Sequence, residues 1–105
     1  MNLELENKTA LVTGSTAGIG LAIAASLARE GATVIINGRT KKRVNDAINQ
    51  ILGQYSDAKL EPLVADVSAS TAIAATTKSY PKLDILINNV GIGELKPFEK
   101  ISDVD

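Results

Sequence analysis

Short apolar runs alternate along the chain with stretches in which apolar residues recur every three or four positions. Four of the runs are bounded by glycine or polar residues, which is typical of buried strands. These expected strands cover residues 9–12, 33–36, 60–65 and 83–88. The segments between them have the period of helices. The expected helices cover residues 19–30, 41–52 and 68–79.

Several residues mark the ends and edges of these elements. Ile19, Ile23 and Leu27 recur every four residues before a glycine, which favours a helix that stops there. Thr40 precedes the second expected helix as a candidate N-cap. Pro62 lies inside the third expected strand, and proline fits a strand only at an edge position or a bulge.

The alternation of strand and helix predicts an α/β fold. Strands that are apolar on both faces belong to a parallel sheet covered by helices on both faces. Right-handed crossovers then fix the hand of the connections. The expected strand order is 3-2-1-4, which is half of a doubly wound sheet with one further strand past the switch point.

A glycine-rich turn joins the first expected strand to the first expected helix. Residues 13–20 read Thr-Gly-Ser-Thr-Ala-Gly-Ile-Gly. Glycine permits a sharp turn and close approach of a phosphate, and the N-terminus of a helix favours an anion. The turn lacks the Gly-Lys-Ser/Thr of a P-loop, so a dinucleotide phosphate fits it better. A plain turn that happens to need glycine is the alternative.

Composition removes several function classes. The 105 residues include no cysteine, no histidine and no tryptophan, and the net charge is -1. A disulfide scaffold, a thiolate or histidine metal site and histidine-dependent nucleophilic catalysis are therefore excluded for these residues. The balanced charge predicts no nucleic-acid partner. No apolar run approaches the ~20 residues of a membrane span, and no signal peptide is recognisable, so a cytoplasmic protein of one domain is expected.

Three motifs together resemble the classical short-chain dehydrogenase/reductase family. They are the glycine turn at residues 13–20, Asp66-Val67 after the third expected strand, and Asn-Asn-Val-Gly at residues 88–91. The family usually has alanine where Val90 stands. The resemblance covers essentially the whole chain and implies a Rossmann-like fold and hydride transfer with a nicotinamide cofactor.

The resemblance also implies a role for each matching position. The glycine turn would cover the cofactor pyrophosphate, Asp66 would accept from the adenine amino group, and Asn89 would contact a ribose through its backbone. Thr13 would tie the turn to the fourth-strand motif. The expected cofactor-binding residues are Gly14, Ser15, Thr16, Gly18, Ile19, Gly20, Asn37, Arg39, Asp66, Val67, Asn89, Val90 and Gly91.

The end of the second expected strand bears on the choice between NAD and NADP. Members of the family that use NAD carry aspartate where Gly38 stands, and Arg39 follows it here. Residues 41–43 add three cations to the first turn of a helix, where they oppose the helix dipole. A bound 2′-phosphate would offset that cost, so we expect NADP, with NAD less favoured. Arg39 would be its main partner, helped by Ser15 and by Lys41 or Lys42; a solvated basic turn is the alternative.

No catalytic residue is expected in this chain. The family uses a serine, a Tyr-x-x-x-Lys pair and an asparagine that follow the fourth-strand motif, and the lysine lowers the pKa of the tyrosine. Tyr55 and Lys59 match the spacing, but they lie too early in the chain. Ser102 and Asp105 resemble the start of a further helix. We therefore expect the N-terminal part of a Rossmann NAD(P)-binding domain, with the catalytic half absent and the isolated chain inactive.

Two other functions remain open for this sequence. One is a stand-alone nucleotide-binding module without catalysis, and the other is a fragment that serves only in assembly. For the enzyme, the partners would be NADP(H), a small carbonyl or alcohol substrate and further copies in a homo-oligomer. The fourth expected strand would be an unpaired edge of the sheet, with the apolar Ile85 and Ile87 near it. We therefore also expect the isolated chain to self-associate.

Overall fold

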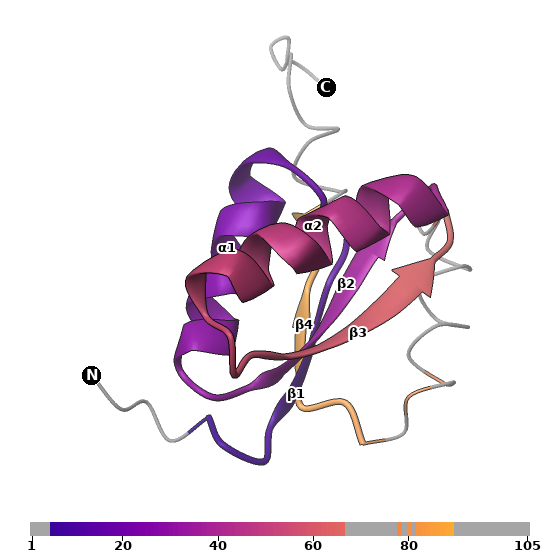
Figure 1. Cartoon of the computed structure of the whole chain (residues 1–105). Helices are drawn as coiled ribbons and strands as arrows, with labels where there is room; N and C mark the ends of the chain where they lie inside the picture. The colour runs from indigo at the N-terminus through magenta and orange to yellow at the C-terminus, as the bar shows by residue number, and fades with distance from the viewer. Residues whose placement is uncertain (1–4, 67–77, 79, 81, 90–105) are drawn as a thin grey trace, which may run out of the picture.

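The computed structural model describes residues 5–66, 78, 80 and 82–89, and these contain one parallel sheet with two helices (Figure 1). The elements are β1 (Thr9–Val12), α1 (Gly18–Arg29), β2 (Thr33–Gly38), α2 (Lys41–Gln54), β3 (Lys59–Val64) and β4 (Ile85–Ile87). The strand order is β3-β2-β1-β4, and every pairing is parallel. The predicted α/β fold and strand order are confirmed, and β3 with its proline is at the end of this order. The helix expected over 68–79 and the helix start at Ser102 lie outside the described residues.

Both described helices pack on the same face of the sheet (Figure 1). Helix α1 contacts β1 and β2, and α2 contacts β2 and β3. The core between these helices and the sheet consists of the buried residues Val12, Ala24, Ala28, Ala32, Val34, Ile36, Val44, Ala47 and Ile51. Leu11 and Ile35 alternate with these strand residues, so they point to the opposite face, and they are also fully buried. The central strands are therefore apolar on both faces, as a parallel sheet requires.

Helix α1 meets the sheet through small residues. Gly20, Ala24 and Ala28 are its buried positions, whereas the side chain of Ile19 is 66% exposed. The predicted helix is confirmed, but the stripe closest to the sheet is one position later than the stripe of isoleucine and leucine. Small side chains let the helix axis approach the strands closely, which sequence periodicity alone does not reveal.

The junction between β2 and α2 is well defined. The Arg43 N–H donates to Thr40 Oγ1 over 3.2 Å, so the predicted N-cap is confirmed. Strand β2 extends beyond its expected end, because Gly38 pairs with Val64 and its carbonyl accepts from the Ala65 N–H over 2.9 Å. No helix in the described part of the chain is long and apolar enough to cross a membrane.

Candidate functional site

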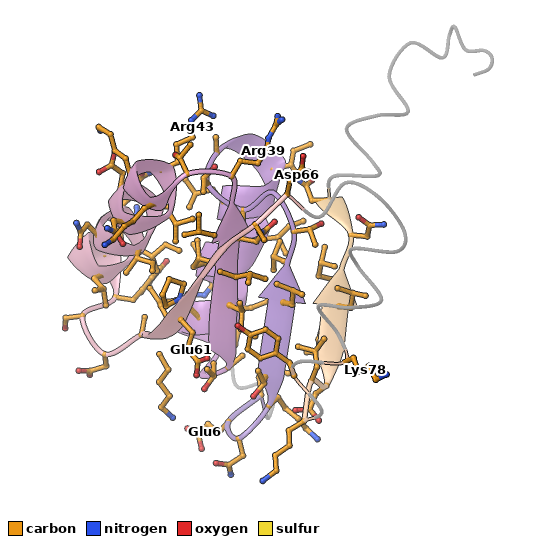
Figure 2. All side chains as sticks on the ribbon, turned by 90° about the vertical axis from the view of Figure 1, so that its right-hand side faces the viewer. Glu6, Arg39, Arg43, Glu61, Asp66 and Lys78 are labelled. Atoms are coloured by element: carbon orange, nitrogen blue, oxygen red, sulfur yellow. The ribbon has the colours of Figure 1, made fainter. Side chains whose placement is uncertain are left out.

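The carboxyl ends of the four strands bring the sequence motifs to one edge of the sheet. β1 leads into the glycine turn, β2 into Arg39, β3 into Asp66 and β4 into Asn89. Figure 2 shows Arg39, Arg43 and Asp66 at the end toward which the strands run, with Glu6 at the opposite end. Ligands of open parallel sheets bind at this edge, where the strand order changes direction.

The glycine turn leaves the N-terminus of α1 open to an anion. Gly14 and Gly18 have φ angles of 59° and 60°, in the left-handed region that favours glycine. Ala17 occupies the N-cap position, no side chain caps this end, and the first turn contains no acidic residue. The N-cap residue therefore supplies no side-chain acceptor to the first N–H groups of α1, unlike in α2, where Thr40 acts as the cap.

Gly20 is required by packing inside the protein. A Cβ atom at this position would overlap the Gly14 carbonyl oxygen and would lie 2.7 Å from Asn89 Nδ2. Asn89 Nδ2 itself donates to the Gly14 carbonyl oxygen over 3.1 Å. The last glycine of the turn therefore lets α1 approach both the turn and the residues that follow β4.

Thr13 joins the same two segments from the side of β1. Its N–H donates to the Ile87 carbonyl oxygen over 3.0 Å, and its hydroxyl donates to Asn88 Oδ1 over 3.3 Å. The predicted tie between Thr13 and the fourth-strand motif is confirmed. The glycine turn is thereby held to β4 by Thr13 at its start and by Asn89 at Gly14.

Asn37 holds the glycine turn to the end of β3. Its side chain is only 2% exposed, and its Oδ1 accepts from the Gly14 N–H over 2.9 Å. Its Nδ2 donates to the carbonyl oxygens of Leu63 and Ala65 over 3.0 and 3.1 Å. Both amide hydrogens are used inside the protein, so the Asn37 side chain positions the turn and does not itself reach toward a ligand. Only its place at the end of β2 had suggested a role at the site.

Ser15 is also an internal contact. It is fully buried, its N–H donates to the Asn37 carbonyl oxygen over 2.8 Å, and its Oγ accepts from the Asn37 N–H over 2.8 Å. The serine therefore completes the attachment of the turn to β2. Nothing in the local sequence pattern separates this serine from one that faces solvent.

The exposed part of the site is basic near α2. Arg39, Lys41 and Arg43 are exposed, and within the described residues they form no ion pair. Lys42 Nζ lies 2.8 Å from Asp46 Oδ2, so this lysine already has an anionic partner. Of the two lysines named from the sequence, Lys41 is the one that remains available to an anion.

The remaining candidates are distributed as follows. Thr16 is half-buried on the turn, Ile19 is exposed beside it, and Asp66 is exposed after β3. The described residues contain no cluster of three side chains that could hold a metal ion. Val67, Val90 and Gly91 lie outside the described residues.

The Tyr-x-x-x-Lys pair at Tyr55 and Lys59 lies at the amino ends of the strands, opposite the candidate site. Tyr55 follows α2, and Lys59 begins β3, where it pairs with Thr33 at the start of β2. At about 3.3 Å per residue, β3 separates Lys59 from the candidate site by roughly 16 Å. This placement keeps the pair away from any ligand bound over the glycine turn.

Comparison with known proteins gives consistent matches over this chain. The family model described as short chain dehydrogenase matches residues 8–105. The "Uncharacterized oxidoreductase YvaG" of Bacillus subtilis (strain 168) is 48% identical over 103 residues, covering 98% of this chain and 39% of that protein.

Two solved structures are similar in fold and sequence. YwfH, an NADPH dependent reductase involved in bacilysin biosynthesis, is 32% identical with a TM-score of 0.72, over 80% of this chain and 36% of that chain. A metagenomic short-chain oxidoreductase in complex with NADP is 31% identical with a TM-score of 0.64, over 78% of this chain and 38% of that chain. The chain thus spans about two fifths of the length of these relatives. With the strand order, the glycine turn and its ties to β4, these matches establish that the chain belongs to the short-chain dehydrogenase family.

Proposed function

We propose that this chain is the cofactor-binding part of an NADP(H)-dependent oxidoreductase, which interconverts a carbonyl compound and an alcohol by hydride transfer. When bound, the nicotinamide supplies or accepts the hydride. The residues described here would bind and orient the cofactor. The proton donor and most of the substrate pocket would come from residues beyond those of this chain.

The observation that carries the proposal is the convergence of an uncapped helix N-terminus and exposed cations at one sheet edge. The open N–H groups at the start of α1 fit a pyrophosphate, because they are donors at the positive end of a helix dipole. The exposed Ile19 side chain beside them offers an apolar surface. Asp66 lies at the same edge after β3, where it would accept from the adenine amino group.

NADP is favoured over NAD by the charges around the end of β2. Gly38 offers no carboxylate to a ribose 2′-hydroxyl, and the exposed Arg39 follows it. Lys41 and Arg43 lie in the first turn of α2, so a dianionic 2′-phosphate would be surrounded by cations. The use of NADPH or NADP by two structural relatives supports this preference.

The proposal is tested by titrating the full-length protein and its Arg39→Ala variant with NADPH and with NADH. We expect the variant to bind NADPH about tenfold or more weakly, because a charged hydrogen bond to the 2′-phosphate is lost. Its affinity for NADH should change little. Lys59→Ala is the matched control, since Lys59 is an exposed cation at the opposite edge of the sheet. Equal losses for both cofactors would contradict the assignment of Arg39 to the 2′-phosphate.

The alternative of a binding module without catalysis makes the same binding prediction and differs in turnover. A protein that binds NADPH and never oxidises it with any of a panel of carbonyl compounds would support the module. Oxidation of NADPH by the full-length protein with any of them would support the enzyme.

A further inference from the structure

Gly38 is buried at the end of β2, and side chains of Thr16 and Val44 occupy the space that a side chain there would need. The φ angle of Gly38 is not positive, so any L-amino acid could adopt the backbone conformation at this position. A Cβ atom added there would lie 2.5 Å from Thr16 Cγ2 and 3.1 Å from Val44 Cγ2. Packed carbon atoms normally approach to about 3.5–4.0 Å, so the Thr16 methyl group is the main obstacle.

The position of Gly38 matters for the choice of cofactor. An acidic residue about 20 positions after the glycine turn, at the end of the second strand, accepts a hydrogen bond from a ribose 2′-hydroxyl. In this chain Gly38 stands at the end of β2, and its carbonyl oxygen is held by the Ala65 N–H over 2.9 Å. The strand is therefore anchored to β3 and cannot shift freely to make room for a side chain.

We propose that Thr16 limits which cofactor this site can be adapted to, because its methyl group occupies the space that a side chain at position 38 would need. It thereby excludes the carboxylate that would favour NAD(H) over NADP(H). The inference rests on the proposed function, since it concerns how that same site selects its cofactor.

Thr16 is held in place by its neighbour in the glycine turn. Ser15 is fully buried and exchanges two hydrogen bonds of 2.8 Å with the backbone of Asn37. Movement of Thr16 away from β2 would strain these bonds. Loss of the Thr16 methyl group alone would remove the overlap, because Thr16 Cβ lies 3.6 Å from the position of the added Cβ, an ordinary contact distance. Val44 would then need to move by only a few tenths of an ångström, at the start of α2.

A carboxylate at position 38 therefore requires two substitutions, one of which is on a different loop. The variants to compare in the full-length protein are Gly38→Asp, Thr16→Ser/Gly38→Asp and Thr16→Val/Gly38→Asp. Serine lacks only the methyl group, whereas valine retains it. Gly53→Asp is the matched control, because a Cβ at Gly53 has no atom within 4 Å.

The readouts are the dissociation constants for NADH and NADPH and the unfolding temperature without cofactor. Gly38→Asp should unfold several degrees lower than the wild type and gain no affinity for NADH. Thr16→Ser/Gly38→Asp should recover most of the unfolding temperature and bind NADH about tenfold or more tightly than Gly38→Asp does. The valine double variant should behave like Gly38→Asp, and Gly53→Asp should keep the cofactor ratio of the wild type.

Two results would overturn the role of Thr16. One is a gain of NADH affinity by Gly38→Asp alone that equals the gain in the serine double variant. The other is identical behaviour of the serine and valine double variants. A wild-type protein that prefers NADH would instead overturn the proposed function. In that event the unfolding temperatures of Gly38→Ala and Thr16→Ser/Gly38→Ala would still report whether the methyl group excludes a side chain.

Discussion

At the scale of single residues, the candidate site depends on buried polar groups whose hydrogen bonds lie inside the protein. Asn37 is buried and bonded through its side chain to Gly14, Leu63 and Ala65. The glycine turn and the segment that leads to Asp66 are thus connected by one amide. A buried amide of this kind stabilises the fold only when its donors and its acceptor all have hydrogen-bond partners.

Truncation of Asn37 should therefore be costly. Asn37→Ala would leave the Gly14 N–H and two carbonyl oxygens without their partner, so we expect the free energy of unfolding to fall by about 2–4 kcal/mol. Urea unfolding of the full-length protein measures this change. Asn49→Ala, on the exposed surface of α2, is the control and should change stability by less than about 0.5 kcal/mol. Similar values for the two variants would show that Asn37 does not hold the turn.

At the scale of the elements, the packing of α1 against the turn decides the shape of the site. Its buried positions are glycine and alanine, and its first buried residue, Gly20, faces the Gly14 carbonyl oxygen and the Asn89 amide. A larger residue would separate the helix N-terminus from the turn. The N–H groups that would receive a phosphate would then be displaced from the end of β1.

Two alanine substitutions at helical glycines test this packing. Gly20→Ala should lower the free energy of unfolding by about 1–3 kcal/mol, because the new methyl group overlaps a backbone oxygen. Gly53→Ala should instead raise it by about 0.5–1 kcal/mol, since Gly53 lies in α2 with open space around it and alanine is the better helix former. Denaturant unfolding of both variants checks the opposite signs. A neutral Gly20→Ala variant would contradict the close approach of α1.

At the scale of the whole molecule, the candidate residues for cofactor binding that the structure describes lie around the carboxyl ends of the four strands of one sheet. The relatives are about two and a half times as long as the part that this chain matches, since that part is 39% of YvaG and 36% of YwfH. We therefore infer that catalysis needs residues beyond this candidate site.

The intact mass of the protein in its native source tests this inference first. We expect a mass well above the 11.0 kDa of this chain, together with oxidation of NADPH when a suitable carbonyl compound is added. A native mass of 11.0 kDa would instead favour a protein that binds a nucleotide without catalysis. In either case, NADPH should raise the unfolding temperature, because a ligand at 100 times its dissociation constant stabilises the folded state by about 2.7 kcal/mol.

Local patterns in the sequence were sufficient for most of the fold. Apolar runs predicted the four strands; the first has the expected bounds, and the ends of the others shifted by one or two residues where pairing with a neighbour extended or shortened a strand. Thr40 was recognisable as an N-cap because capping uses groups within one turn of a helix. The glycine spacing and the Thr13 tie also followed from sequence, through the resemblance of the motifs to the family.

The contacts that shape the site depended on residues far apart in the chain. The bond between Gly14 and Asn37 joins positions separated by 23 residues, and the bond between Asn89 and Gly14 spans 75. These residues come within hydrogen-bonding distance only because β2 and β4 flank β1 in the parallel sheet, each in a fixed register. The sequence thus determined the described strands and helices, because these follow from short-range chemistry, and it supplied the candidate cofactor-binding residues through local motifs. The tertiary structure decided that Asn37 and Ser15 face inward and that Thr16 excludes a side chain at Gly38, since these depend on how the loops meet.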